Sequence, residues 1–506
     1  MQKVSHMNGP WSGRTVTRGR IRRAATCLLV MPMLVSGCAV GPNLARPAVR
    51  APSRYIRGAA SGLPDSRTSY STHSLAVRWW TLFHTPLLNH YIRIALRANP
   101  NLAAARAALA RADALVGAAA AGFLPHAAAT ASAARARALT AGANGGSAYR
   151  IPGNLYTLLL GTVEIRYQPD VFGATADRLH SAQARRRVAA AQLRMNEIFL
   201  EAAVARAVIQ AAGARERWNA ARLIAADDEH LLQLLRLEYR LGASNLQQVR
   251  QQEALTASAR AAIPPLRETV EVSRNALAGL LGVFPDRAPR LPRLSAMRLP
   301  FRLPVALPST LLMHRPDIVA ARAEVQAARA QAKLAAANRF PQVQITAELG
   351  QAAQSGAVFF NPLSTLWSLG TGLVSPIYDG GALASQEKAA IAEYQVSTDH
   401  YRAIVLTAFQ QVADALRALR SGEQTYQQSQ IAATAAGQAL RLARGLYTDG
   451  EIAYSAVLEA EIAAQRDRQA AIEARSQRYL DAVALFLALG EGWSNEHDIA
   501  TSGAQS

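Results

Sequence analysis

The chain has 506 residues, half of them hydrophobic, and its 55 basic and 35 acidic residues give a formal net charge of +20. Its two cysteines, Cys27 and Cys38, are too few for a disulfide framework or a cysteine-based metal site. A basic surplus can indicate nucleic-acid binding, but the arginines are dispersed and form no runs with interleaved aromatic residues. We therefore expect solvated helix faces, or contacts with anionic lipid head groups, and no nucleic-acid partner.

The first 37 residues have the features of an export signal, with six basic residues, no acidic residue and then a short apolar run. The run ends at Val35-Ser36-Gly37-Cys38, which resembles a bacterial lipobox. In a lipobox, the signal peptidase recognises residues such as Val35, Ser36 and Gly37, and the thiol of Cys38 receives a lipid. Cleavage would lower the net charge to +14. The alternative is an ordinary signal peptide with a chance cysteine.

The residue after this cysteine bears on localisation. Ala39 is not the aspartate that holds many bacterial lipoproteins at the inner membrane. We therefore expect a lipid-anchored protein at the outer membrane with a long periplasmic portion.

The chain repeats itself. Residues 99–125 and 315–341 align at an offset of 216 with 11 of 27 positions identical. A second offset of 208 relates a set of Arg, Tyr, Gly, Val and Glu residues, which are Arg236/Arg444, Tyr239/Tyr447, Gly242/Gly450, Val249/Val457, Glu253/Glu461 and Gly282/Gly490. The chain is thus two copies of one unit, a pattern typical of structural assemblies.

Each copy predicts the same order of elements: a moderate helix, a β-hairpin, a very long helix, a tight turn and a returning helix. Residues 173–242 contain no Pro or Gly cluster, so one helix there would be on the order of 100 Å long at ~1.5 Å per residue. Pro264 and Pro265 should kink or shift the first returning helix. We expect a signal peptide (1–37), an extended N-terminal segment (38–78), repeat 1 (79–284), a Pro-rich linker without core residues (285–308), repeat 2 (309–493) and a flexible tail (494–506). Within repeat 1 we expect a hairpin near 126–169, a long helix at 173–241 and a return helix at 244–281. Within repeat 2 the corresponding elements are a hairpin near 342–378, a long helix at 381–449 and a return helix at 452–489.

The predicted hairpins have strands with two different faces. Gln342, Gln344, Thr346 and Glu348 alternate with apolar residues, which indicates a strand with one polar and one apolar face. The segment 126–138 is mostly alanine and has low strand propensity. Four strands cannot close a barrel, and open edges in lipid leave backbone groups unsatisfied at several kcal/mol each. The strands therefore require at least a dimer, and three copies would supply twelve.

Several motifs in order resemble a known family. They are Trp79-Trp80-x-x-Phe83, Asp170-Val171-Phe172-Gly173, His314-Arg315-Pro316-Asp317, Tyr378-Asp379-Gly380-Gly381 and Ala488-Leu489-Gly490-Glu491-Gly492-Trp493. Following a lipobox, they resemble the TolC-like outer membrane factors of tripartite efflux systems, and among these the NodT-type lipoproteins of RND pumps. His314, Glu491 and Tyr378 stand where Arg, Gly and Phe are common in the family.

This resemblance implies the fold class and the partners. The expected fold is mainly α with a β-barrel part: two structural repeats form a long α-helical barrel and four transmembrane β-strands per chain, which close as a homotrimer with a 12-stranded barrel. The implied partners are a periplasmic adaptor (membrane fusion protein), an inner membrane pump of the RND class and outer membrane lipid. The implied function is an exit duct that passively conducts drugs or other small toxic compounds.

The resemblance also implies site residues at the two turns. The periplasmic tips at Arg240, Leu241 and Gly242, and at Tyr447, Asp449 and Gly450, would dock on the adaptor; a plain helical hairpin with an αL glycine is the alternative. Relatives carry two acidic gate rings just beyond the second tip, at positions that are Ala456 and Glu459 here. Glu459 is therefore the candidate gate residue.

The sequence contains no catalytic or cofactor motif. The fingerprints of zinc proteases, serine hydrolases, P-loops and dinucleotide folds do not occur. Asp227, Asp228, Glu229 and His230 are consecutive within a predicted helix, where their side chains point in different directions and cannot bind one metal ion. We predict a non-enzyme without cofactors. The alternative function is a periplasmic helical adaptor or structural lipoprotein without a pore.

Overall fold

A computed structural model describes residues 41–42, 44, 52, 68–71, 78–137, 155–299, 303–306 and 308–490. The chain divides into two compact units. The sheet unit comprises Met1–Leu44, Ala118–His180 and Arg329–Ile391, and the helical unit comprises Ala45–Gly117, Ser181–Ala328 and Ala392–Ser506.

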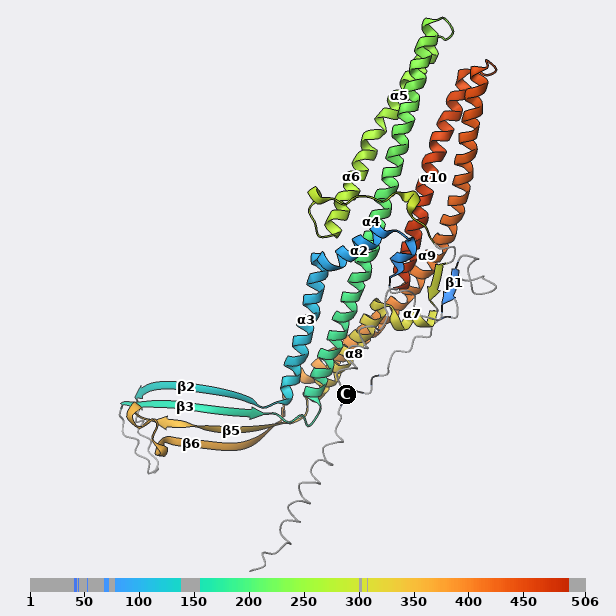
Figure 1. The fold of residues 1–506 in the computed structure, drawn as a ribbon. Coiled ribbons are helices and arrows are strands. Elements are labelled where there is room, and N and C mark those ends of the chain that lie inside the picture. Colours follow the sequence, from blue (N-terminus) through green and yellow to red (C-terminus); the bar gives the residue numbers. More distant parts are fainter. Residues whose placement is uncertain are drawn as a thin grey trace, which may run out of the picture. The chain divides into compact units, whose positions relative to one another are not determined.

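Helices dominate the described residues (Figure 1). The α-helices are α2 (Pro86–Ala98), α3 (Pro100–Ala120), α4 (Ala174–Arg240), α5 (Leu246–Ala261), α6 (Ile263–Leu280), α7 (Pro308–His314), α8 (Pro316–Ala337), α9 (Ala382–Thr448) and α10 (Tyr454–Leu489). The 3₁₀ turns are η2 (Trp79–Phe83), η3 (Ala121–Phe123), η4 (Pro285–Arg287), η5 (Leu294–Ala296), η6 (Gly356–Val358) and η7 (Pro362–Ser364).

The two long helices have the same length. Helices α4 and α9 each contain 67 residues, and both ends are related by the offset of 208. An aspartate caps each start: Asp170 accepts hydrogen bonds from two backbone N–H groups of the first turn of α4, and Asp379 does so beside α9. Helix N-termini favour negative charge, and these backbone hydrogen bonds lower the pKa of Asp379.

The two returning helices differ. In the second copy α10 runs for 36 residues without interruption, whereas in the first copy the chain is divided at Ala262 into α5 and α6. Pro264 and Pro265 lie in the first turn of α6, where a missing N–H group costs little. The single return helix expected over 244–281 is thus two helices, because the prolines start a new one.

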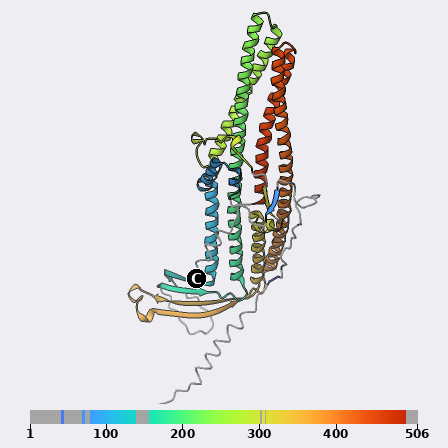
Figure 2. The same ribbon diagram turned by 45° about the vertical axis from the view of Figure 1, so that its right-hand side comes forward.

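The helical unit contains two hairpins at its tip end. Helices α4 and α5 form one hairpin, and α9 and α10 form the other; the two hairpins run side by side in both views (Figures 1 and 2). A buried apolar cluster joins them, with contributions from all four helices. Its buried members are Leu232, Leu235, Val249, Tyr454 and Val457.

The sheet unit holds a four-stranded antiparallel sheet in the order β2-β3-β5-β6. Its strands are β2 (His126–Arg137), β3 (Leu155–Tyr167), β5 (Gln342–Ala353) and β6 (Thr365–Val374). Each repeat supplies one hairpin, and the two meet where Glu164 of β3 pairs with Glu348 of β5. The alanine-rich β2 pairs with β3 along all 12 of its residues, so cross-strand pairing outweighs its low propensity.

A second core lies near the middle of the helical unit. Trp79 is 1% exposed, and its ring stacks on that of Phe486 at 5.2 Å. Its indole N–H donates to the carboxylate of Glu201 at 3.2 Å, and Glu201 is itself only 2% exposed. Burial raises the pKa of Glu201 to about 8, because a desolvated carboxyl favours its neutral form.

The segment 285–308 was expected to be a linker outside the core, and this is wrong. Leu291, Leu294 and Met297 are buried, and the backbone oxygen of Met297 accepts a hydrogen bond from the hydroxyl of Tyr479 at 2.6 Å. Apolar residues between the prolines and arginines let this extended chain cover the helices. Its end forms β4 (Leu303–Ala306), which pairs in parallel with β1 (Thr68–Ser71).

The repeat is visible in matched hydrogen bonds. Asn99 donates to the backbone oxygen of Leu280 at 3.0 Å, and Arg315, its equivalent, donates to that of Ala488 at 2.5 Å. Both side chains satisfy a carbonyl in the last turn of a returning helix, which has no intrahelical partner. The same contact is thus made by a short amide in one copy and by a longer guanidinium in the other.

Candidate functional site

The four-stranded sheet has one polar face. Paired residues of antiparallel strands share a face, so Glu164 of β3, Glu348 of β5 and Ser368 of β6 lie side by side. On the same face Arg166 forms an ion pair with Glu164 at 2.6 Å, and Thr162 is hydrogen-bonded to a threonine of β2. Thr162 is buried, whereas Glu348 is partly exposed, Ser368 and Arg166 are exposed, and these three can contact water or a polar solute.

The opposite face of the sheet is apolar and exposed. Its exposed large side chains come from three strands and are between 37% and 75% exposed in the single chain. They include Val163 and Ile165 of β3, Ile345 and Leu349 of β5, and Trp367, Leu369 and Leu373 of β6. An apolar band of this kind is what a lipid-facing sheet requires.

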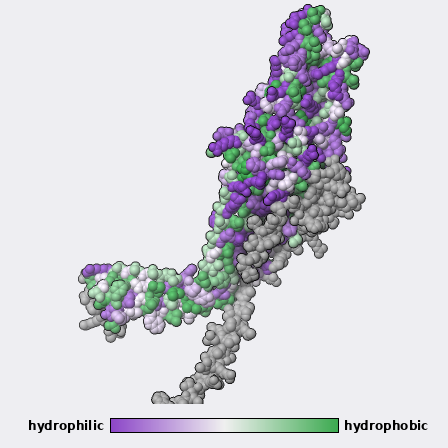
Figure 3. All heavy atoms as spheres, viewed as in Figure 1, coloured by the Kyte–Doolittle hydropathy of each residue, from purple (hydrophilic) through white to green (hydrophobic). Residues whose placement is uncertain are grey.

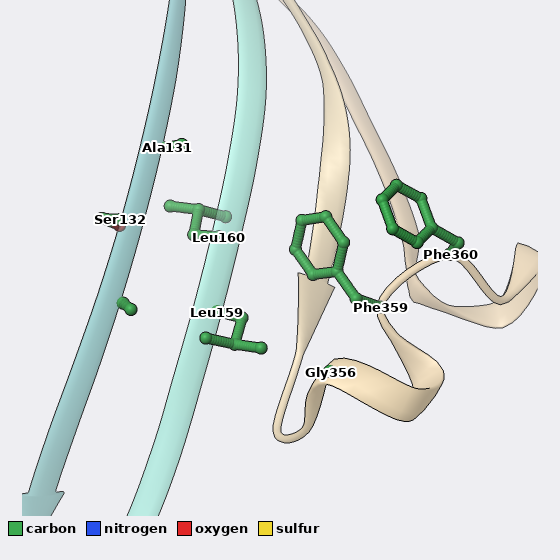
Figure 4. A pocket seen from close by; sticks show the side chains of 8 residues that line it. Ala131, Ser132, Leu159, Leu160, Gly356, Phe359 and Phe360 are labelled. Carbon is green, nitrogen blue, oxygen red and sulfur yellow. The ribbon is translucent and has the colours of Figure 1, made fainter.

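Aromatic residues mark the loop end of this apolar face. Gly161 of β3 lies in register with the residues of this face, and a Cβ added to it would lie 3.0 Å from the ring of Phe359. Phe359 and Phe360 extend from the loop after β5, and with Leu159 and Leu160 they line a cavity of about 400 Å³ (Figure 4). No charged residue lines this cavity, so it offers apolar contact and no acid–base chemistry.

Aromatic residues also lie at the helix end of the sheet. Phe172 and Phe340 stack at 5.2 Å, and Tyr378 is 91% exposed. Aromatic residues at both ends of an apolar band are typical of strands that cross a membrane. Figure 3 shows hydrophobic residues over much of the sheet and hydrophilic residues over much of the helical unit toward the tips.

The turns at the ends of the two hairpins have the same geometry. Gly242 and Gly450 adopt positive φ values of 77° and 76°. The N–H of each glycine donates to the carbonyl three residues before it, and the next N–H donates to the carbonyl five residues before it. This is the Schellman pattern that ends a helix with an αL glycine.

The two tips differ chemically. The first presents apolar and basic groups, with Leu241 at 75% exposure beside exposed Arg240. The second presents exposed Asp449 and Glu451, while Tyr447 is partly buried. The hydroxyl of Tyr447 lies 3.5 Å from the carboxylate of Glu238 on the first hairpin.

The candidate gate residue Glu459 is exposed on α10, on its second turn. The predicted lipobox, Val35, Ser36, Gly37 and Cys38, lies outside the described residues. Among the described residues, no helix has both the length and the apolar character needed to cross a membrane.

The acidic run at 227–230 does not form a metal site. Glu229 forms an ion pair with Arg260, whereas Asp228 is buried and 1% exposed. Within the described part of the chain, no three His, Cys, Asp or Glu side chains are grouped to bind a metal ion.

Sequence reasoning missed a buried polar cluster close to the tips. Asp228 of α4 lies against Glu461 of α10, and Glu461 forms an ion pair with Arg444 of α9 at 2.7 Å. In the sequence, Arg444 and Glu461 stand out because both recur in the repeat, and Asp228 stands out as part of an acidic run. Their meeting depends on the tertiary packing of three helices.

These features agree with comparisons to known proteins. Residues 91–283 and 307–491 match the family of outer membrane efflux proteins. The chain belongs to this family, and the resemblance inferred from its motifs is confirmed.

Individual relatives are similar along most of their length. The chain is 28% identical over 469 residues to the pyoverdine export outer membrane protein OpmQ of Pseudomonas aeruginosa, and the match covers 92% of this chain and 96% of OpmQ. It is 27% identical to nodulation protein T of Rhizobium leguminosarum, over 92% of this chain and 93% of that protein. The solved outer-membrane channel OprN has a TM-score of 0.82 and 25% identity, over 90% of this chain and 100% of OprN.

The family and the fold together define the function class. The chain is an outer membrane channel of an efflux system, as predicted. The combination of long helices and a small antiparallel sheet is that of channel proteins and not of enzymes. This membership favours the channel over the alternative of a periplasmic adaptor without a pore.

Proposed function

We propose that the chain is the outer membrane exit duct of a tripartite efflux pump and that it works as a homotrimer. The observation that carries this proposal is the sheet with one apolar and one polar face. Its outer strands, β2 and β6, have no strand partner on their free edges among the described residues. Open edges in lipid cost several kcal/mol per unsatisfied group, so neighbouring copies would pair β6 with β2 and close a barrel.

The trimer accounts for the polar face as well. Three copies would bring twelve strands together, with Glu164, Arg166 and Glu348 lining a passage and the apolar side chains facing lipid. Small compounds would then pass through water along the polar face. The name of OpmQ refers to pyoverdine, and we infer that this chain also exports small molecules, with the pump selecting them.

The tips are the proposed docking site for a periplasmic adaptor. Arg240, Leu241 and Gly242 form one tip, and Asp449 and Gly450 belong to the other. Their exposure and their αL glycines give two narrow turns of different charge, which suits a partner with helical hairpins of its own. An inner membrane pump of the RND class would supply energy through this adaptor.

Tyr447 and Glu459 complete the proposed periplasmic end. Tyr447 would fix the second tip against the first hairpin. Around a threefold axis the exposed Glu459 would form a ring of three carboxylates, where mutual repulsion favours opening and a bound cation or proton favours closure.

A lipid anchor is proposed at the N-terminus. Val35, Ser36 and Gly37 would be recognised by the lipoprotein signal peptidase, and Cys38 would carry the acyl chains. Several chains attach a protein to a membrane far more firmly than one chain does.

The duct is tested by planar-bilayer recording of the purified full-length protein. Conducting events are expected, and mass measurement in mild detergent should give a trimer. A protein that never conducts, even with its tip residues mutated, or that is a monomer in mild detergent, would overturn the proposal.

The assignment of the two faces has its own test. Leu369 and Ser368 are neighbours on opposite faces of β6. Leu369→Arg should reduce the amount of protein in the outer membrane, because arginine on a lipid face costs about 2–4 kcal/mol near the bilayer midplane. Ser368→Arg, the matched control, should assemble normally and change the conductance. The opposite pattern would reverse the faces.

A further inference from the structure

Two buried carboxyl groups from different hairpins meet near the tips. Asp228 of α4 is 1% exposed and Glu461 of α10 is 3% exposed. Their side chains lie within hydrogen-bonding reach of each other. A carboxylate accepts hydrogen bonds and donates none, so two ionised carboxylates could only repel each other here.

The neighbouring donors of α5 and α10 are engaged elsewhere, and Nε of Arg444 is buried but makes no hydrogen bond to either carboxyl. The amide of Gln252 on α5 donates to the backbone oxygen of Asp228 at 3.2 Å, and the hydroxyl of Thr256 lies 2.8 Å from the backbone oxygen of Gln252 and 3.2 Å from that of Asp228. The hydroxyl of Tyr454 donates to the side-chain oxygen of Gln252. Gln252, Thr256 and Tyr454 therefore do not satisfy the two carboxyls.

The charges in the cluster do not balance. Arg444 donates from Nη2 to Oε1 of Glu461 at 2.7 Å, which pairs one carboxylate. Oδ1 of Asp228 and Oε2 of Glu461 are buried and have no hydrogen-bond partner. A buried unpaired charge is costly, whereas one proton between these oxygens would supply the missing donor and remove the second negative charge.

The other groups that face the pair disfavour a second charge. Asp227 on α4 is acidic. Tyr447 on α9 and Tyr454 on α10 are neutral, with pKa values raised above the usual range by burial. Gln252 and Thr256, the α5 side chains that contact the backbone of Asp228, are neutral. Burial, followed by the proximity of Glu461, raises the pKa of Asp228.

We propose that Asp228 and Glu461 share one proton and form a latch between the α4–α5 hairpin and the α9–α10 hairpin, and that loss of this proton releases the latch. The latch is a property of the single chain. Its consequence rests on the proposed function: loosening the hairpins would favour opening of the periplasmic end as pH rises.

The repeat provides a matched control in the same molecule. Glu253 is the equivalent of Glu461 and pairs with Arg236 at 2.7 Å, but the equivalent of Asp228 is Ala436. The first copy thus has the ion pair without the second carboxyl. Glu253→Gln therefore removes a carboxylate from the same helical position without touching the latch.

The shared proton is tested by infrared difference spectroscopy of the full-length protein between low and high pH, with every protein carrying Glu201→Gln because Glu201 also stays protonated up to a pKa of about 8. The protein without further changes should lose a carbonyl band of a protonated carboxyl as pH rises. This band should be absent in Asp228→Asn and in Glu461→Gln, whose amides supply the donor permanently, and present in Glu253→Gln. The same band in all four proteins would overturn the proposal.

Release is tested by hydrogen exchange of the tip segments 226–240 and 454–462, corrected for the intrinsic effect of pH. Protection should fall at high pH in the wild type and in Glu253→Gln, and it should persist in Asp228→Asn. An equal fall in Asp228→Asn would overturn the latch. Bilayer recordings of the same samples distinguish failure of the latch from failure of the duct. If protection changes with pH as expected but the protein never conducts, only the proposed duct is refuted.

Discussion

The two copies of the repeat contain the same ion pair in different surroundings. Arg236–Glu253 and Arg444–Glu461 are related by the offset of 208, and both have an N–O distance of 2.7 Å. The Glu253 side chain is 26% exposed, whereas that of Glu461 is 4% exposed. Duplication thus preserved the geometry of the contact, while the covering hairpin determines whether the carboxylate can be hydrated.

The largest expected difference between equivalent residues concerns Arg315 and Asn99. Arg315 is buried and pairs with Asp317 while donating to backbone oxygens of two other helices. Arg315→Ala should lower the free energy of unfolding by about 2–4 kcal/mol, because the oxygens of Ala488 and Gln411 lose a buried charged donor. Asn99→Ala removes a helix cap and one further hydrogen bond, for about 1–2 kcal/mol. Thermal unfolding in detergent measures both, and equal losses would contradict the comparison.

A pH effect should arise at Glu201, whose equivalent in the second copy is Phe409. Its pKa rises from 4.5 to about 8, so the folded state holds the proton more tightly than the unfolded chain. The stability from this proton is fully present below pH 4.5 and is lost as pH rises through about 8. Glu201→Gln should flatten this decline, which is on the order of a few kcal/mol.

The Glu201 effect is measured as the thermal midpoint across this pH range. Glu229, whose side chain is partly exposed and pairs with Arg260, provides the control, and Glu229→Gln should keep the wild-type profile. If Glu201→Gln declines with pH as steeply as the wild type, another group is responsible.

The glycines that follow the returning helices should differ in tolerance. Gly282 and Gly490 have φ values of 73° and 66°, so alanine costs about 1–2 kcal/mol at either position. At Gly282 an added Cβ would lie 2.6 Å from the backbone oxygen of Ala98, whereas at Gly490 it would lie 3.0 Å from Cγ of Arg315 and 3.3 Å from Cδ of Pro316, side-chain atoms that need to shift by only a few tenths of an ångström. Gly282→Ala should therefore lower the thermal midpoint more, and the reverse order would show that the Arg315 side chain cannot adjust.

The smallest effect is expected at the arginines of the two ion pairs. Arg444→Met leaves the buried Glu461 without its cation and should cost about 1–2 kcal/mol. Arg236→Met should leave the thermal midpoint unchanged, because Glu253 remains hydrated. Equal midpoints for the two variants would mean that water reaches Glu461 as easily as it reaches Glu253.

Much of the helical architecture can be predicted from the sequence because its signals are local. The stretch without Pro or Gly clusters before Gly242 indicates one long helix, and the repeat locates a second one. The two faces of β5 follow from the alternation that begins at Gln342. By contrast, the strand at His126–Arg137 depends on its pairing with β3, which alanine propensity does not indicate.

The features that the sequence did not predict depend on contacts between distant segments. The linker segment appeared too rich in Pro and Arg for a core, yet Leu294 is 1% exposed beneath its neighbours. In the sequence, Asp228 is one of four consecutive polar residues of a predicted helix, whose side chains point in different directions. Its burial arises only because α5 and α10 pack over that turn, and no local pattern encodes their register.

The equal lengths of α4 and α9 constrain how this protein can change. One residue deleted from either 67-residue helix would shorten it by ~1.5 Å and rotate everything beyond the deletion by about 100°, given 3.6 residues per turn. A deletion in α4 before Asp228 would turn this residue away from Glu461, and Leu241 would point in another direction. Viable length changes in these helices should therefore occur in both copies together, or in steps of about seven residues, which restore the rotation.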